Sequence, residues 1–146
     1  MGCYSDIGGE ALDLTSDDKR NGEIDKIFQA GTHTDVVVNF PANIAAVFNR
    51  WLSTTGVLEM QKSAGISFVK LFVMTADPQC VQALKRSLNA WGSKMRHEIV
   101  QNLDASYEEK YDEIFAEPEL SDLVKRYSIP ILRMPRLAYK PLSTIN

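Results

Sequence analysis

The sequence predicts an α/β protein with a parallel sheet and helices on both faces. From residue 35 onwards, strand-like and helix-like segments alternate along the 146-residue chain. The strand-like segments are continuous apolar runs rich in branched residues, as in strands buried on both faces. The segments between them carry apolar residues at helical spacing. Alternation of this kind is typical of parallel sheets with helical crossovers.

Residues 1–22 predict an irregular segment, and a short helix and the first strand follow it. Gly8-Gly9 and the polar run at 16–22 do not fit regular structure. Residues 23–30 predict a helix with one apolar face. Residues 35–40, with three consecutive valines, predict a strand that Pro41 ends.

The middle of the chain predicts two short helices, a strand and a long helix. Asn43 begins a helix that Gly56 ends, and residues 57–63 form another. Residues 67–75 predict a second buried strand. Asp77 caps the long helix, with Pro78 at its first position.

The last third predicts two more strands with helices between them. The strands cover residues 95–101 and 129–134, and the helices cover 107–115 and 118–127. Because a helix separates each pair of consecutive strands, all four strands should point the same way.

Composition excludes several classes of protein. The apolar content of 45% and the formal charge of −3 do not fit a disordered chain or a globally basic nucleic-acid binder. The apolar runs have the length of strands and are too short to cross a bilayer. Cys3 and Cys80 are too few for a disulfide framework, which favours one cytoplasmic domain over residues 1–146 with free thiols.

The motifs of common catalytic sites are missing from the sequence. There is no G-x-x-x-x-G-K-[ST] phosphate loop and no G-x-S-x-G nucleophile turn. His33 and His97 have no second ligand at metal spacing, so no metal site is expected. Polar residues or prolines follow each strand, at 39–43, 75–78, 102–105 and 134–136, where an open parallel sheet binds its ligands. Turn formation alone also explains such residues.

Several segments together resemble the ParA/MinD-like ATPases with a deviant Walker A loop, of plasmid stability and mobilisation type. The segment from Asp35 through Asn39 and Pro41 to Asn43, followed by Trp51, resembles their Walker B strand and the helix after it. Residues 72–78, followed by residues 81–88, resemble the next strand and helix. Asn102 stands where the family's asparagine reads adenine, and Pro135 and Arg136 stand in the loop that packs against the base. The similarity spans about residues 35–140.

The resemblance implies a partial P-loop NTPase fold that in the complete family binds ATP and Mg²⁺, dimerises and positions DNA or a partner protein. This chain resembles the C-terminal part of such a protein and lacks the Walker A loop. Asn39 replaces the Walker B aspartate, and a neutral amide is a poor partner for Mg²⁺. We therefore expect a protein with a nucleotide-binding fold that does not hydrolyse ATP on its own.

Two other functions remain open, and the expected partners follow from the first. The chain is alternatively a degenerate, non-catalytic protein-interaction module, or an unrelated flavodoxin-like or Rossmann-like enzyme. We expect self-association and a partition or mobilisation protein as partner, with DNA contacted only indirectly and no membrane. Self-association is expected because the family's P-loop strand, a neighbour of the strand at 35–40, is missing.

Overall fold

The computed structural model describes residues 21–40, 44–103 and 108–136, and contacts divide the chain into two compact units. The first unit covers residues 1–67 and the second covers residues 68–146. The predicted irregular segment at 1–22 lies almost entirely outside the described residues, as does the predicted cap Asn43.

The first unit contains three helices, α1 (Asn21–Gly31), α2 (Ala45–Thr55) and α3 (Val57–Ala64). Gly56 has a φ of 68°, and this left-handed conformation ends α2 and begins α3. Trp51 is buried, and its indole Nε1 donates a hydrogen bond to Asp25 Oδ1 at 2.9 Å. The three predicted helices of this part are confirmed, because their apolar spacing gave each of them one face to bury.

The predicted strand at residues 35–40 is wrong. These residues form no strand, and Val37 is 93% exposed. Branched residues favour a strand only where a neighbouring strand accepts and donates the backbone hydrogen bonds. The apolar run therefore stays outside any sheet.

The second unit is a three-stranded parallel sheet with three helices. Along the chain it contains β1 (Val69–Met74), α4 (Pro78–Trp91), β2 (Arg96–Asn102), α5 (Glu108–Phe115), α6 (Pro118–Arg126) and β3 (Ile131–Met134). The sheet order is β1-β2-β3, and both pairs are parallel, as the α/β prediction requires. Register places Phe72 opposite Ile99 and Ile99 opposite Ile131.

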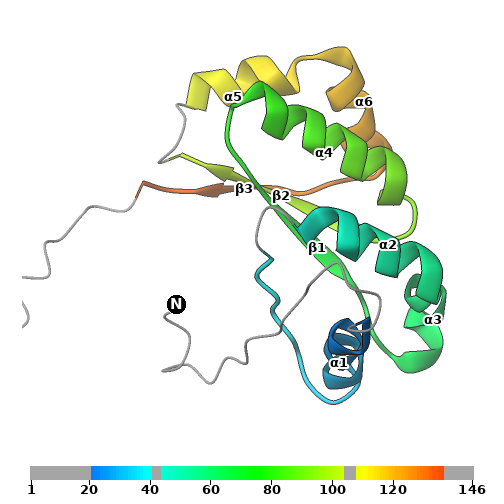
Figure 1. Ribbon diagram of the computed structural model, residues 1–146. Helices are drawn as coiled ribbons and strands as arrows, with labels where there is room; N and C mark the ends of the chain where they lie inside the picture. The colour runs from blue at the N-terminus through cyan, green and yellow to red at the C-terminus, as the bar shows by residue number, and fades with distance from the viewer. Residues whose placement is uncertain (1–20, 41–43, 104–107, 137–146) are drawn as a thin grey trace, which may run out of the picture. The chain divides into compact units, whose positions relative to one another are not determined.

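The core of this unit lies between the sheet and its helices. In Figure 1, α4, α5 and α6 lie on the same side of the sheet. Fully buried side chains from the sheet and these helices form one cluster, which includes Met74, Leu84, Leu88, Ile99 and Leu120. Each such side chain contributes about 1.5–3 kcal/mol to folding through removal of its apolar surface from water.

The opposite face of the sheet is more exposed than its sequence predicts. Val69, Leu71 and Val73 of β1 are 44%, 55% and 57% exposed, and Leu132 of β3 is 48% exposed. Continuous apolar runs predicted burial of both faces of each strand. The structure confirms the strands but shows that β1 is buried on one face only.

Candidate functional site

The carboxyl ends of the three strands form the edge at which a parallel α/β sheet is expected to bind a ligand. Asn102, the last residue of β2, is in register with Met134, the last residue of β3. The Leu103 backbone N–H donates to the Met134 carbonyl at 3.1 Å. Pro135 and Arg136 follow directly and are exposed. The sheet thus brings together the ends of β2 and β3 that carry three of the predicted nucleotide-binding residues.

A buried tyrosine holds this edge together. The Tyr111 side chain comes from α5 and is fully buried. Its hydroxyl lies 2.9 Å from the Met74 carbonyl and 3.0 Å from the Asn102 carbonyl, and donates to both. One proton shared between the ends of β1 and β2 fixes their separation. Sequence reasoning missed Tyr111, because no local pattern distinguishes this contact from an ordinary aromatic core residue.

The beginning of α4 lies at the same edge and is already occupied by a carboxylate. Asp77 is the N-cap, and its Oδ1 accepts a hydrogen bond from the Gln79 N–H at 2.8 Å. Pro78, at the first position, has no N–H to offer. A helix N-terminus attracts anions through free N–H groups and its positive dipole end. Here the Asp77 carboxylate takes that place, so this helix end does not suit a phosphate.

Charged side chains lie beside the end of β3. The Arg133 guanidinium contacts the Glu108 carboxylate and lies 3.9 Å from Asp112. These side chains are about half exposed or more, so the pairs contribute little to stability. The carboxylates of Glu108 and Asp112 also offset the positive charge of Arg133, which would otherwise favour an anionic ligand.

The other predicted residues, Asp35, Asn39 and Pro41, belong to the first unit. Asp35 and Asn39 are exposed residues of the first unit, in the segment that forms no strand. Pro41 lies outside the described residues. Asp35 and Asn39 do not belong to a Walker B strand, because residues 35–40 form no strand.

A hydrogen-bonded relay lies between α4 and the sheet, and sequence reasoning also missed it. Lys70 Nζ donates to Ser87 Oγ at 2.8 Å, and Ser87 Oγ lies 3.0 Å from His97 Nε2. His97 Nδ1 lies 2.9 Å from the Met95 carbonyl and must donate to it. Nε2 is then the acceptor, and the Ser87 hydroxyl donates to it. The relay uses both nitrogens of a neutral imidazole.

Burial sets the ionisation of the two basic groups in the relay. Burial lowers the pKa of His97, as does the nearby Lys70 charge, while the hydrogen bond to Met95 opposes this effect. Burial also lowers the pKa of Lys70. A serine paired with a neutral histidine resembles part of a hydrolase site, but Ser87 is only 8% exposed. Its position in the core favours a structural role for the pair.

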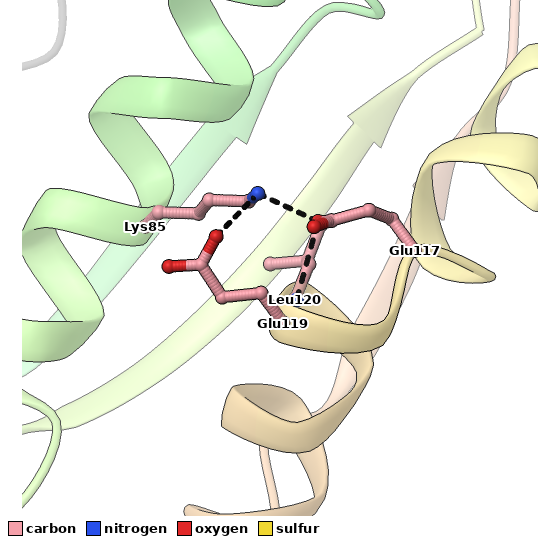
Figure 2. A network of polar contacts seen from close by, with 4 residues as sticks. All are labelled: Lys85, Glu117, Glu119 and Leu120. Atoms are coloured by element: carbon pink, nitrogen blue, oxygen red, sulfur yellow. Dashed lines mark hydrogen bonds and ion pairs between the residues drawn. The ribbon is translucent and has the colours of Figure 1, made fainter.

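A second polar network joins α4 to α6 (Figure 2). Lys85 Nζ lies 2.6 Å from Glu117 Oε2 and 2.8 Å from Glu119 Oε2. Glu117 also caps α6, since its Oε2 accepts from the Leu120 N–H at 3.3 Å. The hydrogen bonds that Lys85 donates to the two carboxylates raise the pKa of Lys85, and its bond to Glu117 lowers the pKa of that carboxylate. Each ion of this network has a partner within the fold, which indicates that the network stabilises helix packing.

Neither a metal site nor a membrane helix is found in the part of the chain that the structure describes. No group of three or more His, Cys, Asp or Glu residues there has the geometry to hold a metal ion. None of the described helices is long and apolar enough to cross a membrane. Cys80 is a half-buried free thiol, and Cys3 lies outside the described residues.

Comparisons with known proteins identify no relative. No protein-family model, no curated protein and no solved structure matches the chain.

Proposed function

We propose that this chain is a ParA/MinD-like nucleotide-binding-fold protein of plasmid partition, stability or mobilisation type, without ATPase activity of its own. The observation that carries the proposal is the carboxyl edge of the sheet, where Asn102 lies beside the end of β3 that leads into Pro135 and Arg136. In the family that this sequence resembles, residues at these positions contact the adenine base. The parallel order of the three strands agrees with that arrangement.

Features that would hold phosphate and metal are not formed among the residues that the structure describes. The α4 N-terminus is capped by the Asp77 carboxylate, and Asn39 is a neutral residue on a segment that forms no strand. Phosphoryl transfer needs a phosphate-binding loop, a cation and a metal in one place. We therefore expect binding of the base without binding of the phosphates, and no role for Mg²⁺.

The test compares adenosine with ATP. Isothermal titration of the purified chain should give dissociation constants for adenosine and ATP that agree within about threefold, with or without Mg²⁺, since about 0.7 kcal/mol corresponds to that ratio. Asn102→Ala should weaken both ligands, and Asn89→Ala, at an exposed position of α4, serves as the matched control. Phosphate release should stay at background.

Two results would overturn the proposal. One result is that adenosine does not bind, or that it binds equally well to the Asn102→Ala variant. The other is Mg²⁺-dependent ATP hydrolysis that Asn39→Ala abolishes, because Asn39 would then act in hydrolysis, a role that the proposal does not give it.

The second candidate function, a non-catalytic interaction module, is favoured by the exposed face of the sheet. Val69, Leu71 and Val73 lie on one face of β1, and β2 is the only described strand that pairs with β1. An apolar edge strand of this kind invites pairing with another chain. The occupant that we propose is a second copy, because the edge strand of each copy, with its apolar face of Val69, Leu71 and Val73, can pair with the other about a two-fold axis.

Sedimentation equilibrium tests this self-association. Leu71→Lys should shift the protein towards monomer, while Met60→Lys, at an exposed apolar residue of α3, should not. A wild-type protein that stays monomeric at high concentration and melts cooperatively above about 65 °C would contradict the idea, because few ordinary domains are that stable.

A further inference from the structure

A cavity lies at the opposite end of the sheet from the Asn102 edge. It is about 420 Å³ in volume, and the turn between α4 and β2, the start of β2 and the turn between α6 and β3 line it. A volume of this size is within the range of small-molecule sites. No residue of the predicted nucleotide site contributes to its lining.

Backbone hydrogen bonds fix the two turns that form the cavity. The N–H groups of Lys94 and Met95 both donate to the Trp91 carbonyl at 2.9 Å. On the other side, the Ser128 N–H donates to the Lys125 carbonyl at 3.1 Å, and Ser128 has a φ of 50°. A non-glycine residue in this left-handed region is uncommon and is held there by its surroundings.

One wall of the cavity depends on a close approach between Gly92 and Tyr127. A Cβ at Gly92 would collide with the Tyr127 ring and would lie 2.6 Å from the Leu88 carbonyl. Only glycine allows the ring to lie at this position. The ring, together with Pro130, gives the cavity an apolar surface beside its polar groups.

The charged residues in the lining are all basic. Lys94 and Arg96 contribute to the lining, and none of the lining residues is acidic. Glu98 forms an ion pair with Arg96 at 2.6 Å, although the Arg96 side chain remains 62% exposed. Lys94 Nζ lies 5.9 Å from the centre of the Trp91 ring. Hydroxyl groups of Ser93 and Ser128 add hydrogen-bond donors to the lining.

His97 links the cavity to a further cation. It is part of the cavity lining, and the Ser87 hydroxyl connects its imidazole to the Lys70 ammonium. Since both imidazole nitrogens already have partners, and burial lowers the pKa of His97, the ring does not itself bind the anion. The Lys70 charge behind it adds to the positive potential at this end of the sheet.

We propose that this cavity binds a small organic anion, with one phosphate or carboxylate group near Lys94 and Arg96 and an apolar, ring-sized body against Tyr127. Basic side chains and hydroxyls suit the anionic group, and the tyrosine face suits the ring. This site is separate from the Asn102 edge, so it stands whether or not adenosine binds there.

Phenyl phosphate is the probe, with inorganic phosphate and phenol as partial probes. Titration is followed through the imidazole NMR signals of the His33→Gln variant, whose single remaining histidine is His97. Phenyl phosphate should shift these signals saturably at concentrations up to about 10 mM, and should bind more tightly than either partial probe. A double variant, Lys94→Gln with Arg96→Gln, should weaken binding about tenfold or more, as expected when charged hydrogen bonds are lost.

The matched control removes two positive charges elsewhere. Lys62→Gln with Lys110→Gln changes exposed residues of α3 and α5 and should leave affinity within about twofold. Equal loss in both double variants would show that only net charge matters, and would overturn the proposal. No shift of the His97 signals, or binding of phenol as tight as that of phenyl phosphate, would overturn it as well.

Discussion

Removal of the Tyr111 hydroxyl tests how the carboxyl edge of the sheet is held. Tyr111→Phe keeps the ring in the core and removes only the donor to the Met74 and Asn102 carbonyls, at 2.9 and 3.0 Å. A single hydroxyl proton serves both acceptors, so one hydrogen bond is lost and two carbonyls lose a partner. Loss of a buried hydrogen bond costs about 1–3 kcal/mol.

Urea unfolding followed by circular dichroism measures this loss. With an m-value of about 2 kcal/mol/M, a loss of about 2 kcal/mol lowers the unfolding midpoint by about 1 M. Tyr127→Phe is the matched control, because the Tyr127 side chain is only half-buried and its hydroxyl has no hydrogen bond among the described residues. The control should change stability by about 0.5 kcal/mol or less. Equal midpoints for the two variants would refute the argument that Tyr111 ties β1 to β2.

Two further predictions concern packing and pH. Gly92→Ala should destabilise the fold by about 1–3 kcal/mol, since its Cβ would displace the Tyr127 ring, whereas Gly31→Ala should be nearly neutral because its nearest contact is at 3.8 Å. Chemical unfolding of the two variants checks this difference, and equal losses would contradict it. The pKa of Glu117 is lowered from 4.5 by Lys85, so its stabilising effect is complete above pH 4.5 and is lost as pH falls towards the folded-state value. In the Glu117→Gln variant, the free energy of unfolding should therefore fall less steeply as the pH is lowered below 4.5. The same pH dependence in the variant and the wild type would contradict this reasoning.

The elements with strong local signals were predictable. The Asp77-Pro78 pair marks the start of α4, since one residue caps the helix and the other has its φ already set. The parallel direction of β1, β2 and β3 followed from the helices between them. The prediction for residues 35–40 failed, because strand propensity describes side chains and does not provide the partner strand that a backbone needs.

The candidate site was predictable only in part. Asn102 and Pro135 could be placed near each other from sequence, since the carboxyl ends of parallel strands meet at one edge. The relay of Lys70, Ser87 and His97 could not, because its members come from two strands and a helix, separated by 17 and 10 residues along the chain. Nothing local in the sequence indicates that Ser87, the serine of α4, faces a histidine across the core.

The exposed face of the sheet shows what an apolar run does and does not establish. On this face β1 presents only valine and leucine, whereas β2 presents Val100 together with Arg96 and Glu98, which form an ion pair. The part of the face near β2 is therefore compatible with water, and the part formed by β1 is not. Because β1 carries apolar residues on both faces, burial of either face is favourable, by about 25 cal/mol per Å² of apolar surface. In the structure, one face of β1 is covered, by α4. The exposed apolar face belongs to the edge strand β1, where pairing with a second copy would add backbone hydrogen bonds and would also bury apolar surface. For this reason, association should depend on Leu71 in β1 more than on Leu132 in β3.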